Sequence, residues 1–393
     1  MPLSPVASLS LSLLAALADG TGAGPASDAG DDFAAEASLL YRIAACGPVA
    51  ATGAGIRGVP PSTTGPLPGS LPAEVADKHC QQMRFLINRW RRRWIEQAVP
   101  FLASIVPATV PTEVVYPFGG GDLFTALATF PHAVTITTLS LEPSGNPLMF
   151  GQATPAEQEH ALSAFRDHVR RLSYATHSKT TNLLAFRHEA LPDQLAFALL
   201  ALVAFDMEPV SLRYFEVDDA GTLHYLTKSQ IDAHTKRRFA NMELGFRRRG
   251  DASAPRRLHR HLQANLADQP LGRTPGVLAH LSSKGHVAAM TKAASFLLWS
   301  PSFARIRNYL LEHADWMISD ATGIPPHFAA ASFEQETWGH FTGAFLAASP
   351  EHEQDFVRLW ASQPTRALPF GFGYPDKQGN DHLLVTRRRA AAP

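Results

Sequence analysis

The segment Thr112–Gly145 constrains the fold of this chain more than any other part of the sequence. It begins with the β-rich run Glu113–Phe118, which the three consecutive glycines Gly119–Gly121 interrupt. Asp122 follows as a suitable N-cap for a short helix, and a second β-branched run covers Thr135–Leu141. This order of strand, glycine turn, helix and strand predicts one half of a nucleotide-type βαβ unit, because glycines let the backbone approach a ligand closely.

Two acids of this unit are candidates for a ligand pocket. Glu142 follows the second strand, roughly 20 residues after the glycines, where a carboxylate can hold a ribose. A turn acid before Pro143 explains Glu142 equally well. Asp122 either caps the helix, which contributes about 1 kcal/mol, or lines the pocket, and both roles are compatible. A carboxylate at this position counts against a phosphate-cradling loop, because it would repel the phosphate.

The composition is that of a globular protein with a large core. Of the 393 residues, 45% are hydrophobic and 18% are charged, and the formal net charge is zero. A neutral chain produces no overall field toward a polyanion, so we expect no nucleic-acid partner. No run approaches the roughly 20 apolar residues that span a bilayer, so we also expect no membrane span.

The N-terminus contains a candidate export signal. Val6–Ala18 is apolar enough for a signal peptide, and its end at Ala16–Ala18 fits the small-residue cleavage pattern. Met1–Pro5 carries no Lys or Arg, so a hydrophobic tail or a first helix of the mature protein is the alternative. We expect an exported protein, or a cytoplasmic one if this segment is not a signal.

The domain boundaries follow from these features. Residues 1–18 are the candidate signal peptide, residues 19–72 form a Gly- and Pro-rich, mostly irregular region, and residues 73–393 form a single α/β domain. The two cysteines, Cys46 and Cys80, exclude a disulfide scaffold. They form one bridge in an oxidising compartment or remain two separate thiols.

Other local patterns predict the remaining elements. An amphipathic helix over Ala73–Val99 opens the domain, with Pro100 as a stop or a kink. Val210–Val217 and Thr222–Leu226 indicate a β-hairpin. We further expect helices at Phe33–Ala45, Pro155–Leu172, Pro192–Phe205, Arg256–Leu266, His286–Leu298, Phe303–His313 and Glu351–Ser362, and strands at Asn241–Arg248, Gly276–Leu281, Trp316–Ser319, Leu368–Tyr374 and His382–Thr386, the last two as a pair. The pattern predicts a doubly wound α/β fold with a mixed sheet, an antiparallel hairpin and edge, and a helical N-terminal extension.

Two further residues are candidates for catalysis. Asp320 follows a predicted strand and can join Asp122 and Glu142 at one edge of the sheet. Three converging carboxylates would either raise one another's pKa for general-base chemistry or hold a divalent cation. Lys292 lies on a predicted apolar helix, either as an ion-pair anchor beside an acid or as a catalytic amine. No pair of histidines has convincing metal spacing, and the G-x-S-x-G motif of hydrolases is absent.

The chain resembles a bacterial family of unknown activity over about Leu71 to Thr386. The resemblance rests on a "YPF-G-D … FP … LEP-G" signature and on a second one, "KAAS-L … D-GIP". The matching residues are Tyr116–Asp122, Phe130-Pro131, Leu141–Gly145, Lys292–Leu297 and Ser319–Pro325. The resemblance implies an export signal at the start of the chain. It also implies a domain of the same kind and candidate site positions, but it implies no particular reaction. Where this family would have a second acid, the chain has Ser319, which puts a paired-carboxylate role there in doubt.

The first unit is also similar, more distantly, to the start of class I S-adenosylmethionine methyltransferases. This resemblance implies a methyltransferase-like sheet in which Gly119, Gly120, Gly121 and Asp122 line the cofactor and Glu142 holds the ribose hydroxyls. The match to G-x-G-x-x-G is incomplete, because Phe124 stands at the third glycine position. A compact adenosyl ligand therefore fits better than a dinucleotide.

Two functions from different classes remain. The first is an S-adenosylmethionine-dependent methyltransferase for a small molecule, with Asp320 or Lys292 in the chemistry. The second is an exported, non-catalytic α/β protein with a structural or ligand-binding role.

Overall fold

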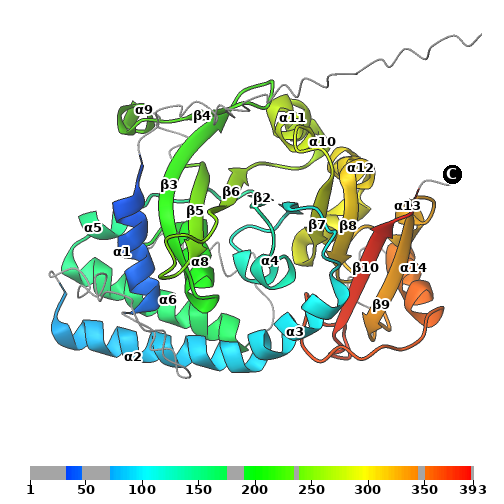
Figure 1. Cartoon of the computed structure of the whole chain (residues 1–393), viewed down its shortest axis with the longest axis horizontal. Helices are drawn as coiled ribbons and strands as arrows, with labels where there is room; N and C mark the ends of the chain where they lie inside the picture. Colours follow the sequence, from blue (N-terminus) through cyan, green and yellow to red (C-terminus); the bar gives the residue numbers. More distant parts are fainter. Residues whose placement is uncertain (1–31, 47–70, 175–189, 234–238, 344–349, 391–393) are drawn as a thin grey trace, which may run out of the picture.

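The computed structural model describes residues 32–46, 71–174, 190–233, 239–343 and 350–390. The candidate signal peptide and most of the irregular region up to residue 72 lie outside the described residues. Within the described residues, one sheet of ten strands forms the centre of the molecule, with helices on both of its faces (Figure 1). The strands are β1 (Glu113–Pro117), β2 (Thr135–Ser140), β3 (Met207–Val217), β4 (Leu223–Tyr225), β5 (Asn241–Arg248), β6 (Arg257–Gln263), β7 (Val287–Thr291), β8 (Ala314–Ser319), β9 (Phe333–Gly339) and β10 (His382–Arg388). The expected mixed α/β class is confirmed.

The strand order is β4-β3-β5-β6-β2-β1-β7-β8-β10-β9. The five central strands from β6 to β8 are parallel, whereas β5, β3 and β4 form an antiparallel hairpin edge. At the other edge, β10 runs antiparallel between β8 and β9. From β1 the chain passes to β2 and β6 on one side, and then to β7 and β8 on the other. The topological switch point, where doubly wound sheets bind ligands, therefore lies between β1 and β7.

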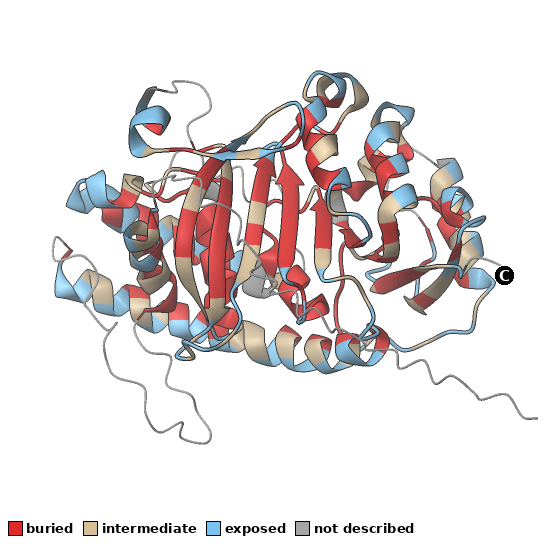
Figure 2. Ribbon diagram, turned by 45° about the horizontal axis from the view of Figure 1, so that its top comes forward, coloured by how far each residue is buried: buried red, intermediate tan, exposed pale blue. Residues whose placement is uncertain are grey.

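Two groups of helices cover the two faces of the sheet. One face packs against α1 (Ala34–Ala45), α4 (Leu123–Thr129) and α8 (Asp193–Ala204), with α2 (Ala73–Trp90), α3 (Glu96–Ile105) and α6 (Pro155–Tyr174) below them in Figure 1. The opposite face packs against α10 (Asp268–Gly272), α11 (Pro275–Ser282) and α12 (Ala304–His313). Successive residues of β1 alternate between these two cores, with Val114 in one and Val115 in the other. Figure 2 shows that the central strands are almost entirely buried.

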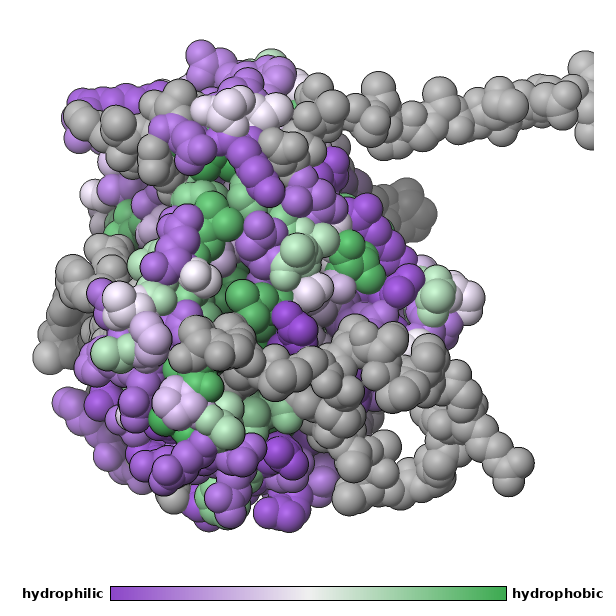
Figure 3. Space-filling model, turned by 90° about the vertical axis from the view of Figure 1, so that its left-hand side faces the viewer, coloured by the Kyte–Doolittle hydropathy of each residue, from purple (hydrophilic) through white to green (hydrophobic). Residues whose placement is uncertain are grey.

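Short helices complete the described structure. They are α5 (Met149–Gln152), α9 (Lys228–Ala233) and α13 (Pro326–Ala329), together with the longer α14 (Pro350–Ala361) beside β9. Thr154 and Glu157 form a reciprocal capping box at the start of α6: the Thr154 amide donates to the Glu157 carboxylate at 2.8 Å, and the Glu157 amide donates to the Thr154 hydroxyl at 3.4 Å. On the side of the molecule that carries α1, α5 and α9, hydrophobic residues are visible between hydrophilic ones at the top and bottom (Figure 3).

Four element predictions are wrong. Arg256–Leu266 contains strand β6 rather than a helix, Gly276–Leu281 lies in helix α11 rather than a strand, and His286–Leu298 contains strand β7 followed by a 3-10 helix at Ala293–Trp299. A fully buried parallel strand such as β7 has no alternating pattern, so periodicity does not distinguish it from a buried helix. Pro275 begins α11 in its first turn, a position that proline favours.

The fourth error concerns the C-terminal strand pair. Strand β10 pairs with β8 and β9, while Leu368–Tyr374 contains no strand. Its backbone instead bonds to side chains: Gly371 O accepts from Trp94 Nε1 at 2.8 Å, and Tyr374 N donates to Asp320 Oδ2 at 3.0 Å. Backbone groups used in this way are not available for the hydrogen bonds between paired β-strands.

The long N-terminal helix continues past its expected end. A π-helical turn, Arg91–Ile95, joins α2 to α3, and Pro100 lies inside α3. Arg91 donates to Ala204 O at 2.9 Å and to Val203 O at 3.0 Å, and so satisfies carbonyls at the C-terminal end of α8. This contact gives Arg91 a structural role.

None of the described helices is long and apolar enough to cross a membrane.

A disulfide joins α1 to α2. Cys46 and Cys80 are bonded, with Cα atoms 4.7 Å apart and a sequence separation of 34 residues. Closing a loop of this length stabilises a folded chain by about 3–4 kcal/mol.

We therefore expect the double variant Cys46→Ser, Cys80→Ser to lose about 3–4 kcal/mol of unfolding free energy, because its unfolded chain is no longer cross-linked. Urea titration of the oxidised protein, the reduced protein and the variant measures this loss. Reduced wild type should match the variant. Equal stability of the oxidised and reduced proteins would contradict the bond.

Candidate functional site

The switch point contains a buried ion pair. Asp122 follows the glycine turn after β1, and Lys292 is the first residue after β7. Lys292 Nζ lies 2.9 Å from Asp122 Oδ2, and the two side chains are 3% and 4% exposed. The interpretation of Lys292 as an ion-pair anchor is confirmed, although the residue ends a strand and does not lie on the expected helix. Its role as a catalytic amine stays a prediction.

Asp122 also caps helix α4. Its Oδ1 accepts from the Thr125 amide at 3.2 Å and from the Thr125 hydroxyl at 3.0 Å, and its Oδ2 accepts from the Tyr116 hydroxyl at 2.9 Å. Burial favours the protonated carboxyl, but the charge of Lys292 and these hydrogen bonds outweigh it and lower the pKa of Asp122. The predicted N-cap is therefore confirmed, and the carboxylate is ionised at neutral pH.

The glycine turn packs against the chain's own side chains. A Cβ on Gly119 would lie 2.6 Å from the Tyr116 ring, and one on Gly121 would lie 2.6 Å from Gln194 Oε1 on α8. Gly120 has a left-handed backbone conformation with φ of 50°. These glycines are thus needed for internal packing. An adenosyl group fits beside Gly119 and Gly121 only if Tyr116 and Gln194 move.

Gln194 is the most unusual neighbour of this turn. It is fully buried, and within the described structure neither its amide nitrogen nor its amide oxygen has a hydrogen-bond partner. A buried amide without partners carries a free-energy penalty of roughly 1–3 kcal/mol. The side of the turn that faces α8 therefore has unsatisfied polar groups.

Asp320 lies at the same edge, one strand further. It is fully buried, and its Oδ1 accepts from the Thr322 amide at 2.9 Å and from the Thr322 hydroxyl. Burial raises the pKa of Tyr116 well above its usual range, and the charges of Asp122 and Asp320 raise it further. Asp122 and Asp320 therefore both lie close enough to Tyr116 to act on it.

Glu142 is placed differently. Its side chain is only 3% exposed. Within the described residues, no hydrogen bond or ion pair connects its carboxylate with Asp122 or Asp320, either directly or through a third side chain. Its backbone carbonyl instead accepts from His261 Nε2 at 2.8 Å. The structure thus joins Asp122, Lys292 and Tyr116 by direct contacts and places Asp320 at the same edge of the sheet, while Glu142 contacts β6.

A chain of hydrogen bonds leads to Glu142 through the sheet. Because a carbonyl only accepts, His261 donates from Nε2, and its Nδ1 accepts from the Thr138 hydroxyl at 3.0 Å. The Thr138 oxygen then accepts from His259 Nε2, also at 3.0 Å. The sequence does not predict this chain, because the pattern predicts a helix over Arg256–Leu266, where residues two apart point in different directions. On strand β6 they share one face.

A segment near the C-terminus lies over the ion pair. Lys292 Nζ is 5.7 Å from the centre of the Phe372 ring, and Gly373 adopts a left-handed φ of 70° against the Asp320 carboxylate. Phe372 is 1% exposed. Together with Tyr374, this segment separates the charged side chains from solvent.

Comparisons of the chain with family models, curated proteins and solved structures found no match. Among the described residues, no group of three or more His, Cys, Asp or Glu side chains has the arrangement of a metal site.

We predict that Asp122→Asn destabilises the fold by about 3–5 kcal/mol, because it leaves Lys292 buried without a counter-charge. Lys292→Met should have a similar cost, and the double variant should cost less than the sum of the two. Chemical denaturation of the four proteins measures the coupling. The exposed pair of Asp167 and Arg170 is the control, where Asp167→Asn should cost below about 1 kcal/mol. Additive effects of Asp122→Asn and Lys292→Met would rule out the pair.

The buried histidines predict a loss of stability in acid. Burial lowers the pKa of His259 to about 3 and that of His261 to about 4, so both stay neutral in the folded protein. The unfolded chain binds protons below about pH 6.5, so the two together reduce the unfolding free energy by about 2–3 kcal/mol per pH unit below that value.

Denaturation of wild type and of the double variant His259→Gln, His261→Gln at a series of pH values between 7 and 5 measures this contribution. The variant should show a shallower loss of stability as the pH falls. Parallel curves would mean that the two histidines titrate alike in the folded and unfolded protein.

Proposed function

We propose that this protein is an exported, non-catalytic α/β protein that has kept a methyltransferase-like sheet, with a structural or ligand-binding role. The observation that carries the proposal is the buried ion pair between Asp122 and Lys292 at the switch point. A general base or an amine nucleophile must reach its substrate. These two groups instead neutralise each other and are shielded from solvent.

Two further observations support the proposal. Within the part of the sheet from β6 to β9, in the order β6-β2-β1-β7-β8-β10-β9, only β10 is reversed, which is consistent with the sheet of class I methyltransferases. The disulfide between Cys46 and Cys80 is a feature of proteins from oxidising compartments. It therefore supports export, where S-adenosylmethionine, a cytoplasmic cofactor, is not supplied.

A second candidate is an S-adenosylmethionine-dependent methyltransferase for a small molecule. The unpaired amide of Gln194 beside Gly121 favours it, because a ligand with polar groups would satisfy that amide. In this alternative, Gly119–Asp122 and Glu142 hold the cofactor after Tyr116 and Gln194 move. Asp320 or Lys292 then takes part in the chemistry.

Calorimetric titration with S-adenosylmethionine distinguishes the two candidates. We expect no saturable heat from the folded protein with about 1 mM ligand, because its own side chains fill the turn. Glu142→Ala serves as the matched variant. Micromolar binding that this substitution abolishes would overturn the non-catalytic proposal.

Export is tested independently by the mass of the protein isolated from its native cells. The proposal expects cleavage after Ala18 and a protein outside the cytoplasm. An intact N-terminus together with a cytoplasmic location would remove export from the proposal.

A further inference from the structure

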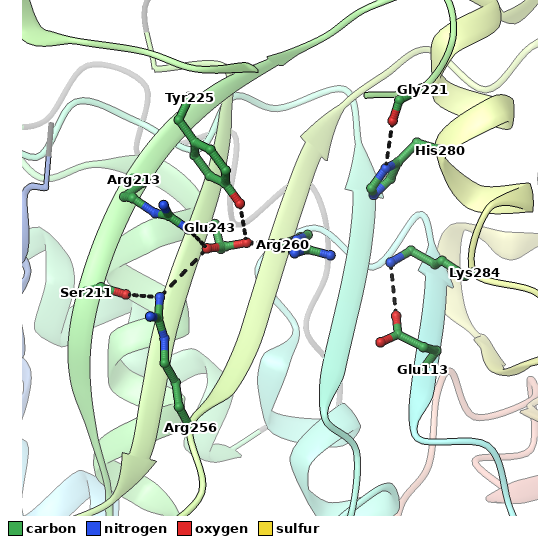
Figure 4. Close-up of polar contacts among 10 residues, drawn as sticks. All are labelled: Glu113, Ser211, Arg213, Gly221, Tyr225, Glu243, Arg256, Arg260, His280 and Lys284. Atoms are coloured by element: carbon green, nitrogen blue, oxygen red, sulfur yellow. Dashed lines mark hydrogen bonds and ion pairs between the residues drawn. The ribbon is translucent and has the colours of Figure 1, made fainter. Parts of the chain in front are cut away.

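A second polar cluster lies on the other part of the sheet, away from the ion pair. Arg213 on β3, Glu243 on β5 and Arg260 on β6 are direct neighbours in the strand register, so their side chains share one face. Figure 4 shows Arg256 and Tyr225 reaching into the same cluster. The residues come from four strands and the loop before β6, so only the folded sheet brings them together.

One carboxylate receives most of the contacts. Glu243 is 1% exposed, and its Oε1 lies 2.5 Å from Arg213 Nη2 and 3.8 Å from Arg256 Nη2. Its Oε2 lies 2.9 Å from Arg260 Nη2 and accepts from the Tyr225 hydroxyl at 2.7 Å. The side chains of Arg213, Arg256 and Arg260 are 22%, 48% and 19% exposed. Each of the three side chains is therefore partly accessible to solvent, whereas the carboxylate is not.

A fourth cation extends the cluster toward β1. Lys284, just after α11, lies 3.0 Å from Glu113 at the start of β1, and its side chain is 5% exposed. Burial lowers the pKa of Lys284, although the charge of Glu113 opposes this shift. Figure 4 shows the Arg260 side chain between Glu243 and Lys284. His280 on α11 has a pKa lowered to about 4, first by burial and then by Lys284, and adds no charge at neutral pH.

The cluster therefore carries a surplus of positive charge. Four cations, Arg213, Arg256, Arg260 and Lys284, meet two carboxylates, Glu113 and Glu243, and the charge of Asp32 also acts on Arg213, which leaves 4 − 3 = +1. The neighbouring Arg247 is paired with Glu208 at 3.0 Å and does not change this sum. A network built only for stability would be expected to balance its charges more closely.

Several polar atoms beside these cations are buried and unpaired. Arg213 Nε and Thr137 Oγ1 have no hydrogen-bond partner in the part of the chain that the structure describes. Thr137 on β2 is fully buried and is the cross-strand neighbour of Arg260. His280 donates from Nδ1 to Gly221 O at 3.1 Å, which leaves Nε2 as an unpaired acceptor. Two of these unpaired atoms, Arg213 Nε and the Thr137 hydroxyl, are hydrogen-bond donors, whereas His280 Nε2 is an acceptor.

The arginines are held in place before any ligand arrives. The Arg213 guanidinium stacks on the Tyr225 ring at 3.7 Å from its centre. Arg256 lies across Gly245, where a Cβ would be 2.5 Å from Nε, and it donates to Ser211 Oγ at 2.6 Å. Side chains fixed in this way lose little conformational entropy on binding, which favours affinity.

We propose that this face of the sheet binds a small dianion of the phosphate-ester class, held by Arg213, Arg256 and Arg260 with Lys284 beside them. A phosphate ester carries close to two negative charges at pH 7 and accepts several hydrogen bonds. The surplus of positive charge favours an anion, and guanidinium groups suit phosphate oxygens geometrically. The site lies in the middle of β3, β5 and β6 and shares no residue with the pair of Asp122 and Lys292, so it stands or falls independently of the proposed function.

The test is calorimetric titration of the full-length protein with inorganic phosphate and, separately, with acetate at equal ionic strength and pH 7.5. We expect saturable binding of phosphate that is at least about tenfold tighter than that of acetate, because the surplus favours a dianion. Added sodium chloride should weaken the binding of phosphate, because salt screens the attraction between the arginines and the anion.

Three variants locate the binding. Arg260→Gln and Arg256→Gln should each weaken phosphate binding by about tenfold or more, because each removes a charge-assisted hydrogen bond. Arg256 is half exposed, so its variant keeps the test valid if Arg260→Gln does not fold. Thr137→Val, which removes only the unpaired hydroxyl, should also weaken binding without lowering stability.

Arg358→Gln on α14 is the matched control, because it removes an exposed arginine that lies 3.5 Å from Asp355. It should bind phosphate like wild type. The proposal is overturned if phosphate gives no saturable heat, if acetate binds equally well, or if Arg256→Gln retains wild-type affinity.

Discussion

The buried ion pair between Asp122 and Lys292 is the contact on which the centre of the molecule depends. Removing two charges from water is unfavourable, so neither side chain is tolerated there without the other. The pair requires the end of β7 to lie beside the start of α4, which fixes β1 and β7 as neighbours. It also explains why Tyr116 and Thr125 bond to Asp122, since a buried carboxylate needs its remaining lone pairs satisfied.

The site at the switch point is consequently closed by the chain itself. Tyr116 fills the space beside Gly119, Gln194 faces Gly121, and Phe372 lies near Lys292. The sequence has glycines and acids where a cofactor-binding sheet would have them, but the same glycines serve close packing. A glycine is required wherever backbone and another group come close, and its presence does not say whether that group is a ligand or a side chain.

Local signals explain which parts of the fold could be predicted. The strand, glycine turn and helix after Thr112 were predicted because each boundary has its own marker, and α8 because Pro192 precedes a long apolar run. Strands β6 and β7 could not be predicted from their own residues, because their sequences show no strand periodicity. Pairing and packing with the neighbouring strands decide their conformation. The sequence predicts Lys292 as an ion-pair anchor beside an acid only as one option, and it does not identify Asp122 as that acid, because it predicts Lys292 on a helix.

The arginine cluster shows a different limit of sequence reasoning. Arg213, Arg256 and Arg260 are spread over nearly 50 positions and form no run, so charge patterning along the chain gives no sign of them. Their meeting depends on the antiparallel register of β3, β5 and β6, which the sequence predicts only as a hairpin and separate elements. Cross-strand neighbours are set by pairing, which composition does not encode.

The position of α1 has a consequence for the order in which the chain can become structured during synthesis. The amide of Phe33 bonds to Leu212 O at 2.7 Å, and the Tyr41 hydroxyl bonds to Met207 O across 166 residues. Helix α1 therefore has no sheet to pack against until β3 has left the ribosome. While the residues between Tyr41 and Met207 are being synthesised, the apolar face of α1, with Leu40 and Ile43, lacks its final partner and is a natural site for a chaperone to protect.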